Sequence, residues 1–246
     1  MRVKQLLIPL LVIVIYLSSI NVDAVNTVLD TTEMSINDKQ TFNSNLSISL
    51  ITDEPPKIGV RCFDVNSSGM LVVYQPSLSG KYISVLSNSG EFIYGYYISN
   101  CSQDIGLEWD TEQNDILNLY FVRSNILASV DSKGNVIDFC EVPLTIENNT
   151  KINNMLYSTS RTVGSMEYHT KNDMGLLNIF ALSYSQIISV NDSGDESIIF
   201  DISSTALYNT VAILIIFILF VFVALTVIIK TVLLIKRKNL SKDKSA

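Results

Sequence analysis

Three carboxylates around position 110 have the residue types and spacing closest to those of a catalytic site. Glu108, Asp110 and Glu112 alternate along a stretch with the composition of a β-strand, so the side chains of each neighbouring pair share one face. Two carboxylates on one face can serve glycoside hydrolysis as acid and as base or nucleophile. An acidic domain contains many such pairs by chance, so a surface hydrolase using carboxylates is only an alternative function.

The single histidine, His169, stands in a segment, 166–170, with the composition of a strand. A general base needs a nucleophile beside it, and the sequence contains no G-x-S-x-G, H-E-x-x-H or P-loop motif to supply one. We therefore expect an ordinary surface or half-buried side chain. The sequence predicts no catalytic residue, no cofactor and no metal ligand, and hence no enzyme.

The segment Asp64-Val-Asn-Ser-Ser-Gly69 matches the first half of a calcium-binding loop. A complete loop ends in a bidentate acid at its twelfth position, which is Gln75 in this chain. The pattern therefore favours a hairpin turn, with side-chain hydrogen bonds to the backbone and Gly69 at positive φ.

Cysteines and glycosylation motifs carry information about the compartment. An oxidising compartment permits one disulfide among Cys62, Cys101 and Cys140, but the spacing does not choose among three pairings, and three reduced thiols remain an alternative. N-x-S/T triplets arise by chance in a chain this rich in Asn and Ser, although they leave open a viral or eukaryotic type I surface glycoprotein. The triplets begin at Asn45, Asn66, Asn100, Asn148 and Asn191.

The C-terminal region predicts a membrane anchor. Residues 211–229 contain no charge, Gly or Pro, and at about 1.5 Å per residue this run matches a hydrocarbon core of about 30 Å. We place a transmembrane helix at 206–235 and a cytoplasmic tail at 236–246, because basic residues gather on the cytoplasmic side. The expected interface anchors are Lys230, Lys236, Arg237 and Lys238.

The N-terminal region predicts a signal peptide at 1–24, with Arg2 and Lys4 before an apolar stretch and Ala24 before the expected cut. Residues 25–206 hold nine Lys and Arg against 22 Asp and Glu, a net charge of −13. An acidic domain of this kind is not expected to bind nucleic acid. The predicted localisation is a single-pass cell-membrane protein with its N-terminal domain outside.

The outer domain divides into a polar N-terminal segment, 25–57, expected to be loosely packed, and a β-rich part, 58–205. Within the latter, 117–134 aligns with 177–194 without a gap, and an earlier copy covers 70–98. Each copy predicts strand, loop, strand, glycine turn and strand, with a further strand before it at 58–64, 105–110 or 165–170. The predicted turn glycines are Gly69, Gly90, Gly134 and Gly194.

A four-stranded antiparallel unit that repeats at about 45 residues is typical of a β-propeller blade. Residues 63–93 resemble an NHL-type blade, whose pattern is D-x-x-G-x-h-h-V followed by h-x-V-h-x-x-x-G-x-h. The outer domain also resembles uncharacterised membrane-anchored proteins of low-GC Gram-positive bacteria. The resemblance implies a propeller-like fold over 58–202 and no particular activity.

Three copies are fewer than the four to eight blades of a closed propeller. The copies could form an open stack, complete a ring with another subunit, or be hairpins of a sandwich; an unrelated β-rich domain with chance periodicity is a fourth alternative. The predicted function is a non-catalytic interaction or sensing module. Its expected partners are the lipid bilayer and either another protein or a second copy that completes the β-array.

Overall fold

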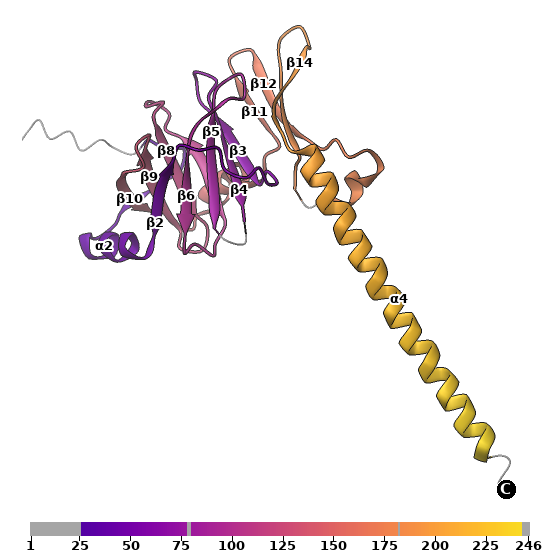
Figure 1. Cartoon of the computed structure of the whole chain (residues 1–246). Helices are drawn as coiled ribbons and strands as arrows, with labels where there is room; N and C mark the ends of the chain where they lie inside the picture. Colours follow the sequence, from indigo (N-terminus) through magenta and orange to yellow (C-terminus); the bar gives the residue numbers. More distant parts are fainter. Residues whose placement is uncertain (1–25, 78–79, 182, 243–246) are drawn as a thin grey trace, which may run out of the picture.

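The computed structural model describes residues 26–77, 80–181 and 183–242, with side chains described up to Thr231. The described chain is mostly β-sheet, in three antiparallel sheets, with one long C-terminal helix that projects away from them (Figure 1). The predicted signal peptide and the side chains of Lys236, Arg237 and Lys238 lie outside the described residues.

Each of the three sheets contains four strands that follow one another in the chain. The first sheet has the order β2 (Ser47–Ile51), β6 (Phe92–Ser99), β5 (Lys81–Leu86), β4 (Leu71–Pro76) and β3 (Cys62–Val65). The second has β1 (Thr32–Glu33), β10 (Val136–Glu141), β9 (Ile126–Asp131), β8 (Ile116–Phe121) and β7 (Ile105–Trp109). The third has β11 (Ser160–Val163), β12 (Met166–Lys171), β13 (Gln186–Val190) and β14 (Glu196–Asp201).

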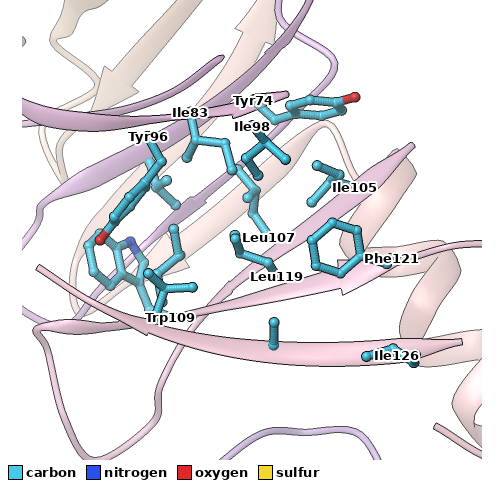
Figure 2. Close-up of a cluster of buried hydrophobic side chains, with 14 of the residues drawn as sticks. Tyr74, Ile83, Tyr96, Ile98, Ile105, Leu107, Trp109, Leu119, Phe121 and Ile126 are labelled. Carbon is cyan, nitrogen blue, oxygen red and sulfur yellow. The ribbon is translucent and has the colours of Figure 1, made fainter. Parts of the chain in front are cut away.

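The first sheet is the middle layer of the stack. One of its faces packs on the second sheet through a large core that includes Tyr74, Tyr96 and Trp109 (Figure 2). Its other face packs on the third sheet, where Phe63 meets Tyr168 and Phe200. The inner edge strands β3, β7 and β11 are neighbours, and the described residues contain no closed ring of sheets.

The four predicted glycines all lie in tight turns with φ between +82° and +86°. Each turn uses one device: a Ser, Asn or Asp side chain accepts hydrogen bonds from the backbone N–H groups two and four residues later. The glycine between them takes the left-handed conformation that other residues adopt only at a cost. The accepting residues are Asn66, Ser87, Asp131 and Asn191.

The domain is not all β, in contrast to the prediction. Helix α3 (Ile146–Tyr157) packs on the face of the second sheet that is turned away from the first. Thr145 caps α3 by accepting a hydrogen bond from the backbone N–H of Asn148, and the helix buries Ile152, Met155 and Leu156 against Tyr120 and Leu127. The part of the outer face of the second sheet around Tyr120 and Leu127 is therefore covered by the chain itself.

The N-terminal segment is ordered, whereas its polar composition predicted loose packing. Strand β2 pairs along its whole length with β6, and helix α2 (Ile36–Asn45) places Phe42 edge-on against Phe121 and Phe139, with ring centroids 5.4 and 5.3 Å apart. The backbones of β10 and β6 form ladder hydrogen bonds with β1 and β2, and these bonds do not depend on apolar side chains. Composition alone could not reveal this source of order.

The third sheet departs from the predicted alignment. The expected strand at 177–182 is replaced by a short 3-10 helix, η1 (Gly175–Phe180), and the strand predicted at 165–170 is the second strand of its sheet and not the first. Asn178 explains the difference, because its side chain accepts from the N–H of Met174 at 2.8 Å and donates to the carbonyl of Asn172 at 3.1 Å. These bonds close a turn where Asn118 lies in a strand.

The C-terminal helix α4 (Ser203–Lys242) begins three residues before the predicted start at 206. Its stretch Ser203–Thr231 is long and apolar enough to cross a membrane, and the helix is not buried in the domain. Lys230 lies at the end of the apolar run, and its role as an interface residue stays a prediction.

Candidate functional site

A cavity of about 570 Å³ opens where the inner strands of the sheets converge. The ends of β3 and β7 form its floor, α3 forms one wall, and Arg161 of β11 closes another. Its polar lining residues are Asp64, Asn66, Ser67, Glu108, Asp110, Thr111, Asn114, Lys151, Asn154 and Arg161.

Asp64 and Arg161 form the central ion pair of the cavity. The guanidinium Nε donates to Asp64 Oδ1 at 3.1 Å, and the backbone N–H of Trp109 donates to Oδ2 at 2.8 Å. The other guanidinium nitrogens donate to the carbonyls of Ser160, Asn154 and Met155. Burial raises the pKa of Asp64, and the hydrogen bond from Trp109 and the charge of Arg161 oppose that rise. Both charged groups are therefore engaged by internal partners.

Glu108 and Asp110 hold the N-terminal segment against the second sheet. Glu108 accepts hydrogen bonds from the Thr27 hydroxyl and, at 2.8 Å, from the backbone N–H of Val28. Asp110 accepts from the backbone N–H of Asn26 at 3.1 Å and from two N–H groups of its own turn. Burial raises the pKa of Glu108, while the bonds from Thr27 and Val28 lower it. The alternating carboxylates serve as attachment points for the segment that precedes the sheets.

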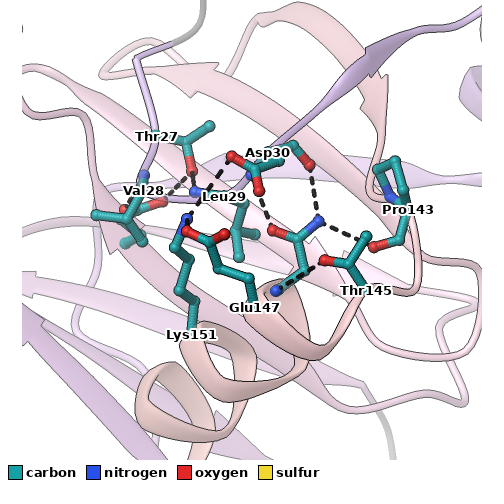
Figure 3. A network of polar contacts seen from close by, with 10 residues as sticks. Thr27, Val28, Leu29, Asp30, Pro143, Thr145, Glu147 and Lys151 are labelled. Carbon is teal, nitrogen blue, oxygen red and sulfur yellow. Dashed lines mark hydrogen bonds and ion pairs between the residues drawn. The ribbon is translucent and has the colours of Figure 1, made fainter.

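A second polar network joins this segment to α3, as Figure 3 shows. Lys151 lies 2.9 Å from Glu147 and 3.7 Å from Asp30. Buried Asn148 accepts from the backbone N–H of Asp30 and donates to the carbonyls of Asp30 and Pro143, each at 2.9 Å. The wall of the cavity is thus fixed by bonds between parts of the chain more than 100 residues apart.

His169 does not line this cavity, whereas Asn66 of the calcium-like motif does. His169 Nε2 lies 3.3 Å from Glu167 on the third sheet. The side-chain oxygen of Asn66 accepts hydrogen bonds from Ser68 and Met70, so the calcium-like motif forms a turn. Trp109 also lines the cavity, and its side chain is buried in the core between the first and second sheets.

The three cysteines are free thiols, so the disulfide that the sequence allowed is not formed. Cys62 is buried on β3 and donates to the carbonyl of Ile105 at 3.5 Å, and burial raises its pKa to about 12. Cys101 and Cys140 are half-buried, and burial raises the pKa of each. None of the three lines the cavity.

Sequence reasoning missed Asp64, Lys151 and Arg161 as members of one site. Arg161 and Asp64 are 97 positions apart, and only the packing of the third sheet on the first brings them together. A weak signal existed, because Arg161 is one of nine basic residues in an outer domain with 22 acids. No protein-family model matches the chain, and a comparison with curated proteins also gives no match.

Proposed function

We propose that this protein is a non-catalytic recognition or sensing module, tethered to the cell membrane by α4 with its sheets outside and its basic tail in the cytoplasm. The observation that carries the proposal is that the charged groups of the cavity have hydrogen-bond partners within the fold. Asp64, Glu108 and Asp110 each accept internal hydrogen bonds, and the guanidinium of Arg161 donates to four partners. A site whose charged groups already hold internal hydrogen bonds is suited to binding rather than to proton transfer.

The ligand chemistry follows from the groups that remain. Thr111 and Asn154 offer hydroxyl and amide groups, and Val28 and Met155 offer apolar contact. Asn114 offers only its amide NH2, because its side-chain oxygen accepts from the Ser67 hydroxyl. Uncharged ligands with several hydroxyl or amide groups, such as short glycans or peptides, match this lining. The acidic surroundings disfavour nucleic acid.

A propeller-like arrangement of the three sheets supports a recognition role. Each sheet has its first strand at the inner edge, β3, β7 or β11, and a glycine turn before its last strand. We propose that they are blades of an open stack related to the NHL type, in which the cavity lies at the inner strand ends. Because α3 covers the second sheet, a different protein is a better candidate partner than a second copy docking on that face.

A binding screen tests the proposal. The full chain in nanodiscs is titrated with neutral glycans and peptides, beside a Thr111→Trp variant that fills the cavity and an Ile93→Trp control that adds the same bulk on exposed β6. We expect at least one compound to bind the wild type and the control but not Thr111→Trp. Binding that survives Thr111→Trp would place the ligand elsewhere.

A surface hydrolase is the second candidate, favoured by the raised pKa of both Asp64 and Glu108 beside one cavity. A general acid requires a carboxyl group whose pKa lies above its ordinary value. Turnover in a glycan and ester panel that disappears in Glu108→Gln or Asp110→Ala would replace the recognition proposal with this one.

The type I glycoprotein alternative meets a structural obstacle at two of its five motifs. Asn66 and Asn148 are 3 % and 0 % exposed, and both side chains are engaged in hydrogen bonds. A glycan on either would disrupt the fold. Asn45 and Asn100 are exposed, so a mass shift on endoglycosidase treatment would have to come from such sites.

A further inference from the structure

The third sheet is joined to α4 almost without a linker. Only Ile202 separates β14 from the helix, and it is buried, with its N–H donating to the carbonyl of Ser185 at 2.8 Å. Asp201 caps the helix by accepting from the N–H of Ser203 at 2.7 Å. The sheets therefore stand directly on the membrane helix, which begins about 12 Å before the start of its apolar run at Val211, since each residue adds about 1.5 Å.

The short helix η1 lies beside the first turns of α4 (Figure 1). Met174, just before η1, accepts from the Thr210 hydroxyl through its sulfur at 3.8 Å. Thr210 is the last polar residue before the apolar run, so this contact places η1 at the level where the membrane interface is expected. Three large apolar side chains of η1 are exposed there: Leu176 at 93 %, Ile179 at 82 % and Phe180 at 48 %.

A groove of about 880 Å³ separates η1 from α4. Ile179 and Phe180 line one side, and Ala206, Ile213 and Ile216 line the other. None of its described lining residues is charged. Because Ile213 and Ile216 belong to the segment that crosses the membrane, the lower part of the groove is continuous with the lipid-facing surface of α4.

We propose that η1 is a second membrane contact, in which Leu176, Ile179 and Phe180 insert into the outer leaflet while a phospholipid acyl chain fills the groove beside α4. Apolar side chains gain free energy when they leave water, and interfacial helices insert to a depth of about 5–10 Å. The uncharged lining binds the acyl chain without selecting a headgroup. Two contacts, η1 and α4, then fix the tilt of the sheets and the direction in which the cavity faces.

Quenching by brominated lipids tests the insertion directly. The full-length Ile179→Trp variant is placed in nanodiscs, one chain per disc, with phosphatidylcholine brominated either near the headgroup end or near the methyl end of the acyl chain. The native Trp109 is buried in the outer domain and supplies a constant background. We expect loss of the new emission, stronger with the shallow bromines, and a blue-shifted maximum.

The matched control is Ile146→Trp, at a site 88 % exposed at the start of α3. Its emission should resist brominated lipid and respond to aqueous acrylamide. If Ile179→Trp behaves in the same way, η1 does not insert and the proposal fails. If quenching of Ile179→Trp falls when discs hold two chains, a second copy of α4 fills the groove in place of lipid, which also overturns the assignment.

Discussion

Two buried tyrosines of the main core differ in the surroundings of the hydroxyl group. Tyr74 and Tyr96 are both fully buried between the first and second sheets. The Tyr96 hydroxyl donates to the carbonyl of Asp131 at 2.8 Å, whereas the Tyr74 hydroxyl has no hydrogen-bond partner among the described residues. A buried hydroxyl without a partner has lost its bonds to water and gained nothing in return.

This difference predicts opposite effects of the same substitution. Tyr74→Phe should raise the free energy of unfolding by about 1 kcal/mol, and Tyr96→Phe should lower it by about 1 kcal/mol. Thermal unfolding followed by the fluorescence of Trp109, the single tryptophan, measures both. Equal destabilisation by the two variants would mean that the Tyr74 hydroxyl has a partner, such as an internal water.

A pH prediction follows from Glu108. Burial raises its pKa above the value of about 4.3 expected in the unfolded chain, so the folded state favours the protonated form. The resulting stability is fully present below about pH 4 and is lost as the pH rises through the raised pKa of the folded state. The stability of the wild type relative to Glu108→Gln should therefore fall with rising pH.

Comparing unfolding free energies of these two proteins at several pH values isolates the effect. The variant removes one titrating group and keeps the shape, while Asp131 and Asp201, whose pKa values are lowered, contribute with the opposite sign to both proteins equally. If the free energy of unfolding of the wild type instead rose with pH relative to that of Glu108→Gln, the bonds from Thr27 and Val28 would outweigh burial.

At the scale of elements, the glycine turns offer a matched comparison. Gly90 ends the turn between β5 and β6, and Gly194 lies in the corresponding turn between β13 and β14, with φ values of +86° and +83°. A Cβ on Gly90 would lie 2.2 Å from the carbonyl oxygen of Ile199, whereas a Cβ on Gly194 would meet nothing within 4 Å. The two sites share the backbone strain and differ only in contact with a neighbouring sheet.

Gly194→Ala should therefore cost about 1–2 kcal/mol, the price of the left-handed conformation for Ala. Gly90→Ala should cost about 1–3 kcal/mol more, because the turn must move away from β14. Denaturant unfolding midpoints at constant slope measure both. Equal losses would argue that the first and third sheets do not touch at Ile199 in solution.

Much of the strand pattern could be predicted, because alternating β-branched residues and turn glycines are local signals. The predicted secondary structure was wrong where local signals are ambiguous. Asn118 and Asn178 occupy aligned positions, yet one bonds to Ser129 within the second sheet and the other closes η1. Helix α3 has few apolar positions, and its stability depends on burial against a sheet that sequence alone does not place beside it.

At the scale of the whole molecule, the sequence carries a signal for the order of the layers. The segments 71–74 and 116–121 are nearly continuous apolar runs, and a strand buried on both faces requires such a run. Strands of the third sheet, such as 166–171, mix apolar and polar residues, as expected of an outer layer. The cavity could not be predicted, since Asp64, Lys151 and Arg161 meet only through this stacking.

The stack of sheets ends at the second sheet, where α3 packs on the outer face. Helix α3 buries Ile152 and Met155 on the outer face of the second sheet, so the full-length protein should be monomeric in mild detergent. Ile152→Glu together with Met155→Glu should displace α3 and expose that face, and light scattering after size-exclusion chromatography should then detect association, because an uncovered apolar sheet face promotes contact with another copy. Ile146→Glu is the control, since Ile146 belongs to the same helix but is 88 % exposed. A wild type that forms dimers, and loses them in the double variant, would instead mean that α3 joins two copies, and the stack would extend across them.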